Sequence, residues 1–192
     1  MNREELIFAL ADRIKAAKGA DKPFILAIDG RCAAGKTTLA QELSRLTGAA
    51  VVHMDDFFLQ PFQRTKARLD TPGENVDWER FKAQVLLPLS RGETARFRPF
   101  DCHTLGFKEE SFISPENGII VEGTYCLHKA LRDFYSLKVF ADIPPQAQRE
   151  RIEKRNGKGG AAAFVQKWIP LEESYFSACD PAAICDYVIT SE

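Results

Sequence analysis

The stretch PFILAIDGRCAAGKT, residues 23–37, decides the fold of this chain. Its apolar run from Phe24 to Ile28 predicts a strand buried on both faces, as in a parallel sheet covered by helices. Residues 30–37 match the pattern G-x-x-x-x-G-K-[ST] at every fixed position, and a helical pattern runs on from Gly35 to Leu46. A strand, a glycine-containing turn and a helix start therefore predict a loop whose backbone N–H groups bind phosphate.

In such a loop, the lysine and the hydroxyl residue that follows it have separate roles. The Lys36 ammonium would reach the β- and γ-phosphates of a nucleotide, and the Thr37 hydroxyl would ligate Mg²⁺. We therefore expect ATP, the commonest donor, and Mg²⁺ as cofactors. The expected cofactor-binding residues are Gly30, Arg31, Cys32, Ala33, Ala34, Gly35, Lys36, Thr37 and Thr38.

Strand and helix patterns alternate along most of the remaining chain. Further strands are predicted over 49–54, 118–121, 137–143 and 186–190, and helices over 3–18, 78–90, 127–135 and 144–155. This alternation predicts an α/β fold with a parallel sheet of about five strands and helices on both faces. We expect one domain over residues 1–192, whose ligands lie beyond the carboxyl ends of the strands.

Composition argues against several classes of partner. The 26 basic residues nearly cancel the 27 acidic ones, so no charge surplus favours nucleic acid. No apolar run approaches the roughly 20 residues that span a bilayer, and the N-terminal segment lacks the features of a signal peptide. The five cysteines include no C-x-x-C pair, which indicates reduced thiols and a cytoplasmic protein. Cys32 is either a small loop filler or, beside a helix N-terminus, a thiolate.

Two carboxylates follow predicted strands at the phosphate-loop edge of the sheet. Asp55 comes directly after the strand over 49–54, where it could orient an acceptor hydroxyl and take its proton. Glu122 ends the strand over 118–121 and could hold Mg²⁺ or contact the acceptor. A simple charge at a strand end is the alternative for each, while His53 is expected in the core or at its rim.

Cations gather on the segment that precedes three glycines near residue 160. Arg151 and Arg155 share a helical face at a spacing of four residues, and they could stabilise the transferring phosphoryl group from a lid over about 149–160. The alternative is a solvated basic face. Two long connections, about 57–76 and 91–117, are expected to be acceptor-site insertions, with His103 as a candidate ligand.

The tetrapeptide DTPG at residues 70–73 leaves a second class of function open. These letters occur in a switch motif of GTPases, and they support a nucleotide-dependent switch or regulatory protein as the rival hypothesis. The motif's aspartate should end a buried strand, whereas residues 63–68 here are polar. No N-K-x-D sequence that reads guanine is present. The tetrapeptide is therefore predicted to be a turn.

In these motifs and their order the chain resembles the uridine kinase branch of the P-loop kinases, which is related to phosphoribulokinase and bacterial pantothenate kinase. The resemblance implies that Asp55 is the general base, that Asp77 contacts acceptor hydroxyls, and that Glu122 lies near metal and acceptor. It implies lid roles for Arg151 and Arg155. The segment PFDCH at 99–103 implies substrate contacts from Phe100, Asp101 and His103, although it is one residue shorter than in uridine kinases.

The resemblance thus implies transfer of the γ-phosphoryl group of ATP to a hydroxyl of a small molecule. A nucleoside such as uridine is the first acceptor to consider, and pantothenate or a sugar is the alternative. Lys36, Asp55, Arg151 and Arg155 are the expected catalytic residues. The expected partner is the small acceptor, with neither nucleic acid nor membrane.

Overall fold

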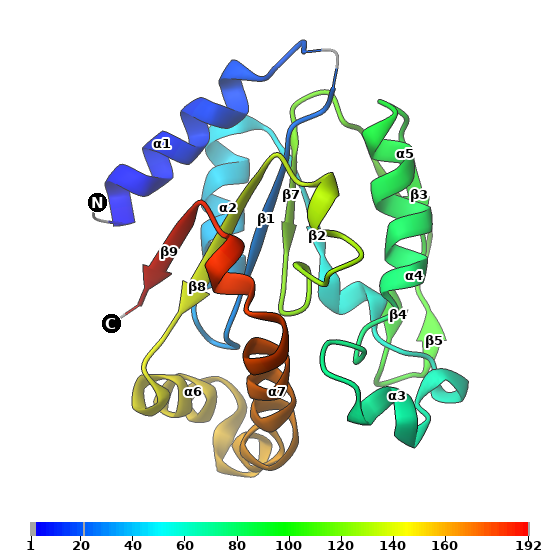
Figure 1. Cartoon of the computed structure of the whole chain (residues 1–192), viewed down its shortest axis with the longest axis vertical. Helices are drawn as coiled ribbons and strands as arrows, with labels where there is room; N and C mark the ends of the chain where they lie inside the picture. Colours follow the sequence, from blue (N-terminus) through cyan, green and yellow to red (C-terminus); the bar gives the residue numbers. More distant parts are fainter. Residues whose placement is uncertain (1–2, 21, 192) are drawn as a thin grey trace.

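A parallel sheet of five strands forms the centre of the molecule (Figure 1). The structure, a computed structural model, describes residues 3–20 and 22–191. The strands are β1 (Ile25–Gly30), β2 (Ala50–His53), β7 (Ile119–Glu122), β8 (Leu137–Asp142) and β9 (Tyr187–Thr190). They lie in the order β2-β7-β1-β8-β9, and every neighbouring pair is parallel. The predicted fold class is confirmed.

Strand β1 supplies both hydrophobic cores. Ile25 and Ala27 pack into one cluster while Leu26 and Ile28 pack into the other, because successive side chains of a strand point to opposite faces. All four are at most 1% exposed. Each fully buried Leu or Ile contributes about 1.5–3 kcal/mol, so this continuous apolar run stabilises both layers at once.

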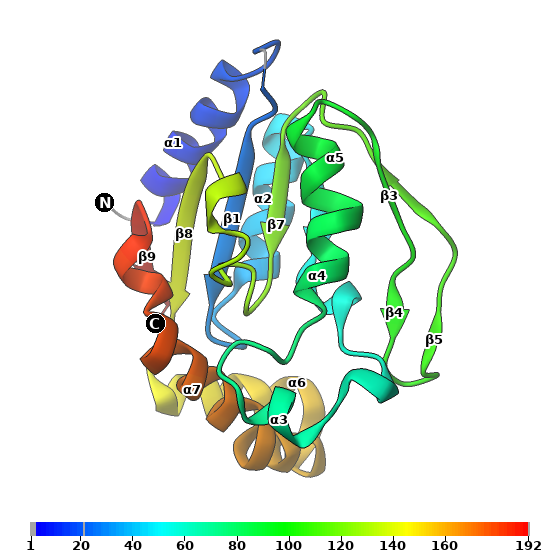
Figure 2. The ribbon, with the colours of Figure 1, turned by 45° about the vertical axis from the view of Figure 1, so that its right-hand side comes forward.

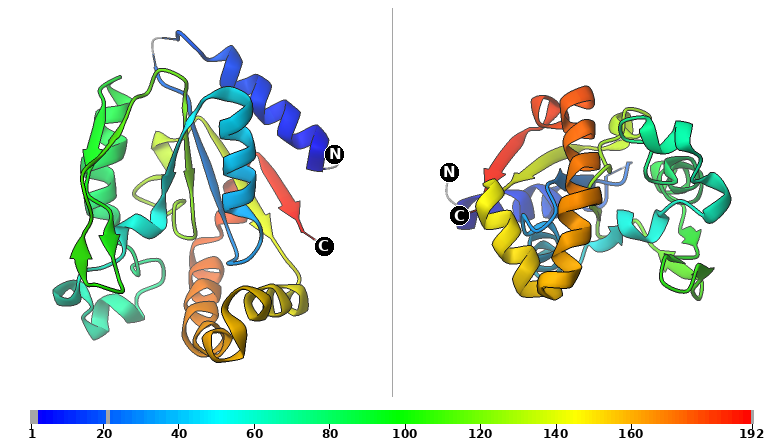
Figure 3. Two further views of the ribbon diagram at one scale, coloured as in Figure 1. Left: turned by 180° about the vertical axis from the view of Figure 1, so that it is seen from behind. Right: turned by 90° about the horizontal axis from the view of Figure 1, so that it is seen from below.

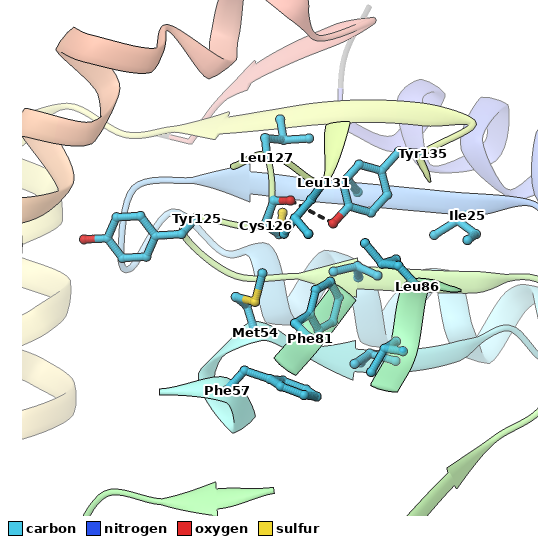
Figure 4. Packing of buried hydrophobic residues seen from close by; sticks show 14 of the residues in the cluster. Ile25, Met54, Phe57, Phe81, Leu86, Tyr125, Cys126, Leu127, Leu131 and Tyr135 are labelled. Atoms are coloured by element: carbon cyan, nitrogen blue, oxygen red, sulfur yellow. Dashed lines mark hydrogen bonds between the residues drawn. The ribbon is translucent and has the colours of Figure 1, made fainter. Parts of the chain in front are cut away.

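Helices α1 (Arg3–Ala16) and α2 (Lys36–Thr47) cover one face of the sheet, and Figure 3 shows both in the view from behind. A second helical segment covers the opposite face, where Figure 4 shows its Phe81 and Leu86 among the buried side chains. It consists of α4 (Trp78–Phe81), the π-helical turn η3 (Lys82–Leu86) and α5 (Leu87–Ser90). The Asp77 side chain caps this segment by accepting from the Arg80 amide at 3.1 Å.

The helix predicted over residues 127–135 is wrong. The structure has turns there and one 3₁₀ helix, η4 (Arg132–Phe134). The Leu127 amide donates instead to the buried carboxylate of Asp29 at 2.8 Å, and the Leu127 carbonyl accepts from Arg132 Nε at 2.9 Å. The backbone bonds of the segment join residues three apart, such as the Leu131 amide to the His128 carbonyl at 2.8 Å, so it forms successive turns rather than an α-helix.

The two long connections contain short ordered elements. The first holds the 3₁₀ helices η1 (Met54–Phe57) and η2 (Pro61–Gln63) and the helix α3 (Lys66–Asp70), and a turn over 71–75 includes most of the DTPG tetrapeptide. The second forms two antiparallel strand pairs, which extend to one side of the sheet (Figure 2). They pair β3 (Ala95–Phe97) with β6 (Ser111–Ile113), and β4 (Phe100–Asp101) with β5 (Gly106–Phe107).

Two helices lie beyond the carboxyl ends of the central strands (Figure 1). Helix α6 (Pro145–Ala163) is longer than predicted and contains a break at Gly157, whose φ of 69° and ψ of 168° are not helical. It contains the segment predicted as a lid. The π-helical turn η5 (Phe164–Trp168) leads into α7 (Ile169–Cys179), and the 3₁₀ helix η6 (Pro181–Ile184) leads on to β9.

No helix in residues 3–20 and 22–191 is both long enough and apolar enough to cross a bilayer. The single domain predicted over residues 1–192 stays a prediction, and its residues 1, 2, 21 and 192 lie outside the described part of the chain.

We predict opposite stability changes for two glycine substitutions. In Gly30→Ala the new Cβ would lie 2.0 Å from the Ala141 carbonyl oxygen, at a φ of 137°. Both effects force the backbone to move, so the free energy of unfolding should fall by about 2 kcal/mol or more. The control is Gly159→Ala, where a Cβ meets nothing within 4 Å in a helix. In Gly159→Ala the free energy of unfolding should rise by up to about 1 kcal/mol. Urea unfolding tests both, and equal stabilities would contradict the prediction.

Candidate active site

A cavity of about 660 Å³ opens at the carboxyl end of the sheet. Five parts of the chain line it: the loop after β1 with the start of α2, the segments that follow β2 and end β7, the connection before α4, the loop between β4 and β5, and the helical segment from α6 to α7. The lining residues with polar or aromatic side chains are Cys32, Lys36, Thr37, Thr38, Asp55, Phe58, Cys102, His103, Glu122, Thr124, Tyr125, Arg151, Arg155, Asn156, Phe164, Trp168 and Glu172.

The loop over residues 30–37 wraps around the Lys36 ammonium. Lys36 Nζ donates to the carbonyl oxygens of Gly30 and Arg31, each at 2.8 Å, and its side chain is buried. Gly35 has a φ of 87° and makes no side-chain cap, so the first N–H groups of α2 keep their donors for a ligand. A helix start of this kind binds anions through its amides and its positive dipole end.

Asp55 lies in η1, directly after β2, and its side chain lines the cavity. Loss of solvation raises the pKa of this carboxyl group, while the charge of Lys36 opposes the rise and that of Glu122 adds to it. A carboxylate with a raised pKa is a better proton acceptor than an ordinary aspartate. The carboxyl group of Asp55 therefore lies at the wall of the same cavity as the phosphate loop.

Glu122 joins the phosphate loop to the neighbouring strand. Thr37 Oγ1 donates to Glu122 Oε1 at 3.1 Å, and His53 Nδ1 lies 2.6 Å from the same oxygen. The parallel register sets the second contact, since His53 is the partner of Glu122 across β2 and β7. Hydrogen bonding to Glu122 raises the pKa of His53.

The oxygen atoms of Thr37 and Glu122 fit a magnesium ion. In the described part of the chain, no cluster of three or more His, Cys, Asp or Glu side chains could hold a metal. Mg²⁺ at phosphate sites usually takes only one or two carboxylates and completes its shell with phosphate oxygens and water. One hydroxyl and one buried carboxylate 3.1 Å apart meet that requirement.

The two lid arginines reach the cavity from helix α6. Arg151 Nη1 donates to the carbonyl oxygen of Ala33 at 3.1 Å, so it contacts the phosphate loop directly. The guanidinium of Arg155 lies 5.5 Å from the ring centre of Phe164 and also lines the cavity. Both arginines therefore line the same cavity as the phosphate loop.

The predicted acceptor residues separate into two groups. Asp55, Glu122 and His103 line the cavity, whereas Asp77, Phe100 and Asp101 do not. The carboxylates of the latter group serve the local backbone, since Asp77 caps α4 and Asp101 accepts from the His103 amide at 2.8 Å.

Phe100 and Cys32 both serve the packing of the protein. The ring of Phe100 packs on Phe107 with centres 5.5 Å apart. Burial and the nearby carboxylate of Glu172 raise the pKa of Cys32 to about 12, which favours the thiol form in the loop over the thiolate. Gln148 Nε2 contacts both its carbonyl oxygen and its Sγ at 3.2 Å.

Sequence reasoning missed several residues that line the cavity. The buried Glu172 accepts from the Cys32 amide at 3.1 Å and brings a carboxylate against the phosphate loop. Thr124 Oγ1 lies 3.3 Å from Lys36 Nζ, and Trp168 packs near Phe58. The sequence could have indicated Thr124 and Tyr125, because they directly follow the strand-end residues 122–123. Trp168 and Glu172 belong to η5 and α7, far along the chain, and no nearby motif indicates them.

The fold is that of the P-loop kinases. No protein-family model matches the chain. The chain is 22% identical over 159 residues to uridine-cytidine kinase 2-B of Danio rerio. The aligned region covers 74% of this chain and 61% of the Danio rerio protein. The chain thus spans less than two thirds of the length of this curated relative.

Solved structures agree with that sequence similarity. A possible uridine kinase from Bacillus stearothermophilus matches 98% of this chain and 100% of its own, with a TM-score of 0.70 and 25% identity. A putative fructose transport system kinase from Silicibacter sp. TM1040 matches 98% and 99%, with a TM-score of 0.76 and 20% identity. Within the P-loop kinases, the resemblance to uridine kinase-like proteins is therefore confirmed.

We predict that Glu122→Gln lowers the pKa of His53. The carboxylate stabilises the imidazolium form, and without it the partial burial of His53 favours the neutral form. Because the pKa is raised in the folded protein, this pair stabilises the fold below about pH 6.5, and the contribution is lost as the pH rises through the folded pKa. An NMR titration of the histidine rings measures the shift. The internal control is His128, a buried histidine that contacts Glu74 and not Glu122. An unchanged His53 pKa would contradict the prediction.

Proposed function

We propose that this chain transfers the γ-phosphoryl group of ATP to a hydroxyl group of a small molecule, and that the acceptor is a nucleoside such as uridine. One observation carries the proposal. The phosphate loop over 30–37 and the carboxylate of Asp55 line the same cavity, whose volume of about 660 Å³ is typical of small-molecule sites. The similarity to a uridine-cytidine kinase and to a possible uridine kinase supports the choice of acceptor.

In the proposed reaction, the chain's own residues bind, orient and accept a proton. The loop amides and Lys36 hold the phosphates, and Asp55 orients the acceptor hydroxyl and takes its proton as the new O–P bond forms. The bond between the γ-phosphorus and the ADP oxygen breaks in the same step. Arg151 and Arg155 stabilise the charge on the transferring group. Thr37 and Glu122 would hold Mg²⁺, which would supply positive charge beside the phosphate groups.

The rival hypothesis of a nucleotide-dependent switch has less support. None of the residues of the DTPG tetrapeptide lines the cavity, and Gly73 lies instead beside the rings of Tyr175 and His128. Asp55, by contrast, faces a space large enough for an acceptor. A switch protein needs no such pocket next to the γ-phosphate.

We predict that Lys36→Ala abolishes turnover. The substitution removes the cation at the centre of the phosphate loop, so ATP affinity and phosphoryl transfer should both fall, by at least about a hundredfold in kcat/KM. Lys154→Ala is the matched control because Lys154 is an exposed residue of α6 that does not line the cavity. ADP release in the presence of uridine, cytidine, fructose or pantothenate measures turnover, and an active Lys36→Ala enzyme would refute the phosphate-loop assignment.

Asp55→Asn should lower kcat strongly while ATP binds with little loss. The amide keeps the size of the side chain but cannot accept the proton, and general-base catalysis contributes about 10²–10⁴-fold at most. In a loose transition state we expect the lower part of that range. Asp56→Asn, one residue further and outside the cavity lining, is the control. Acceptor-dependent ADP release and calorimetric ATP binding separate the two effects, and an unchanged rate would remove the base assignment.

A further inference from the structure

A carboxylate from a distant helix contacts the phosphate loop. Glu172 belongs to α7, which lies beside the carboxyl end of β1 (Figure 1), and its Oε2 accepts from the Cys32 amide at 3.1 Å. Glu172 is only 6% exposed, and it lines the same cavity as the loop. Backbone N–H groups of a loop with this sequence are the groups that bind phosphate. Glu172 therefore uses one of the donors that a nucleotide would use.

The same carboxylate lies near the Lys36 ammonium. Thr124 connects the two side chains, since Lys36 Nζ donates to Thr124 Oγ1 at 3.3 Å and Glu172 Oε1 lies 3.4 Å from that hydroxyl oxygen. The positive charge of Lys36 also acts on the ionisation of Glu172. Glu172 thus has a loop amide and the loop cation as its partners, and a phosphate group would have the same two partners.

The charge of Glu172 depends on these two partners. Burial raises the pKa of Glu172, while the charge of Lys36 and the hydrogen bond from the Cys32 amide oppose the rise. A phosphate group that took both partners would leave a buried carboxylate unpaired beside a second anion. Like charges repel far more strongly in a protein cavity than in water, because the effective dielectric constant is lower. The carboxylate and a phosphate group therefore exclude each other from this part of the loop.

Other side chains hold the loop through its carbonyl oxygens. The carbonyl oxygens of residues 32–34 accept, in order, from Gln148 Nε2 at 3.2 Å, Arg151 Nη1 at 3.1 Å and Ser191 Oγ at 2.9 Å. These contacts shape the loop without using the N–H groups that a phosphate requires. Glu172 differs from them because it binds an N–H group and brings a negative charge. It is therefore placed as a rival of the phosphate rather than as a further support of the loop.

We propose that Glu172 is an internal competitor of the nucleotide: its carboxylate and a nucleotide phosphate compete for the Cys32 amide and for Lys36. The affinity of the loop for ATP and ADP is lowered as a result. The carboxylate leaves the amide when phosphates bind and returns when they dissociate, which favours release of ADP. The inference rests on nucleotide binding by the loop, which is part of the proposed function, and it is independent of the identity of the acceptor.

Two variants of Glu172 test the competition. Glu172→Gln removes the charge and keeps the size of the side chain, so the affinity for ADP and for ATP, measured by calorimetry, should rise about tenfold. Glu172→Ala removes the hydrogen-bond acceptor as well and should raise both affinities at least as much. The control is Glu153→Gln, which makes the same change in net charge at an exposed position of α6 outside the cavity lining. Solvent and salt screen that position, so both affinities should change less than about twofold.

A comparison with and without Mg²⁺ separates competition from two other roles. Mg²⁺ offsets part of the phosphate charge, so competition predicts a larger gain in affinity for ADP in EDTA than for ADP with Mg²⁺. If Glu172 were a metal ligand, Glu172→Gln would lower the affinity only in the presence of Mg²⁺. If Glu172 only supported the loop, both variants would lower the affinity under both conditions, together with the melting temperature. Either of these results would overturn the inference.

The fate of the inference can be distinguished from that of the proposed reaction. Higher nucleotide affinity in both Glu172 variants, without ADP release from any acceptor, would support the inference and refute the proposed reaction. Acceptor-dependent ADP release by the wild-type protein, with unchanged or lower nucleotide affinity in the variants, would refute the inference and leave the reaction standing. Failure of the wild-type protein and both variants to bind ADP or ATP would overturn both.

Discussion

The buried carboxylate of Asp29 is the interaction on which the site depends. It ends the apolar run of β1 and accepts three hydrogen bonds, from the amides of Gly30 and Leu127 and from the hydroxyl of Tyr175. Burial raises its pKa and these three donors oppose the rise, which is the condition under which a charged group is tolerated in a core. Through it, β1, the turn after β7 and helix α7 are held against one another.

Strand order then brings the chemical groups together. In the strand order β2-β7-β1, the carboxyl ends of three parallel strands lie side by side. One edge of the sheet therefore holds the phosphate loop after β1, Asp55 after β2 and Glu122 at the end of β7. The register pairs His53 with Glu122 across β2 and β7. His53 Nδ1 and Thr37 Oγ1 therefore contact the same carboxylate oxygen of Glu122. Rigid strands rather than loops therefore set these distances, which favours catalysis that works by positioning.

Local patterns predicted the half of the site that lies on strand ends, and tertiary contacts decided the rest. The run over residues 23–37 carries its own signal because strand, loop and helix start are adjacent in the chain. Glu172 and Trp168 carry none, since nothing near residue 170 indicates that α7 packs on the loop. Asp77 and Asp101 were predicted to face the acceptor, but backbone amides nearby use their carboxylates. The helix predicted over 127–135 is replaced by turns, and the Leu127 amide at their start donates to Asp29, a residue nearly a hundred positions earlier.

Helix α7 links the core to the phosphate loop through two side chains three residues apart. Tyr175 donates to Asp29 within the core, while Glu172 accepts from the Cys32 amide at the loop. The first contact is buried and the second is partly buried, so α7 cannot shift without breaking a bond in the core or at the loop. Its preceding turn carries Trp168 to the cavity wall, and α6 carries the two arginines. Helix α7 is therefore fixed, through Tyr175, to the same carboxylate that binds the Gly30 amide, whereas helix α6 contains a break at Gly157.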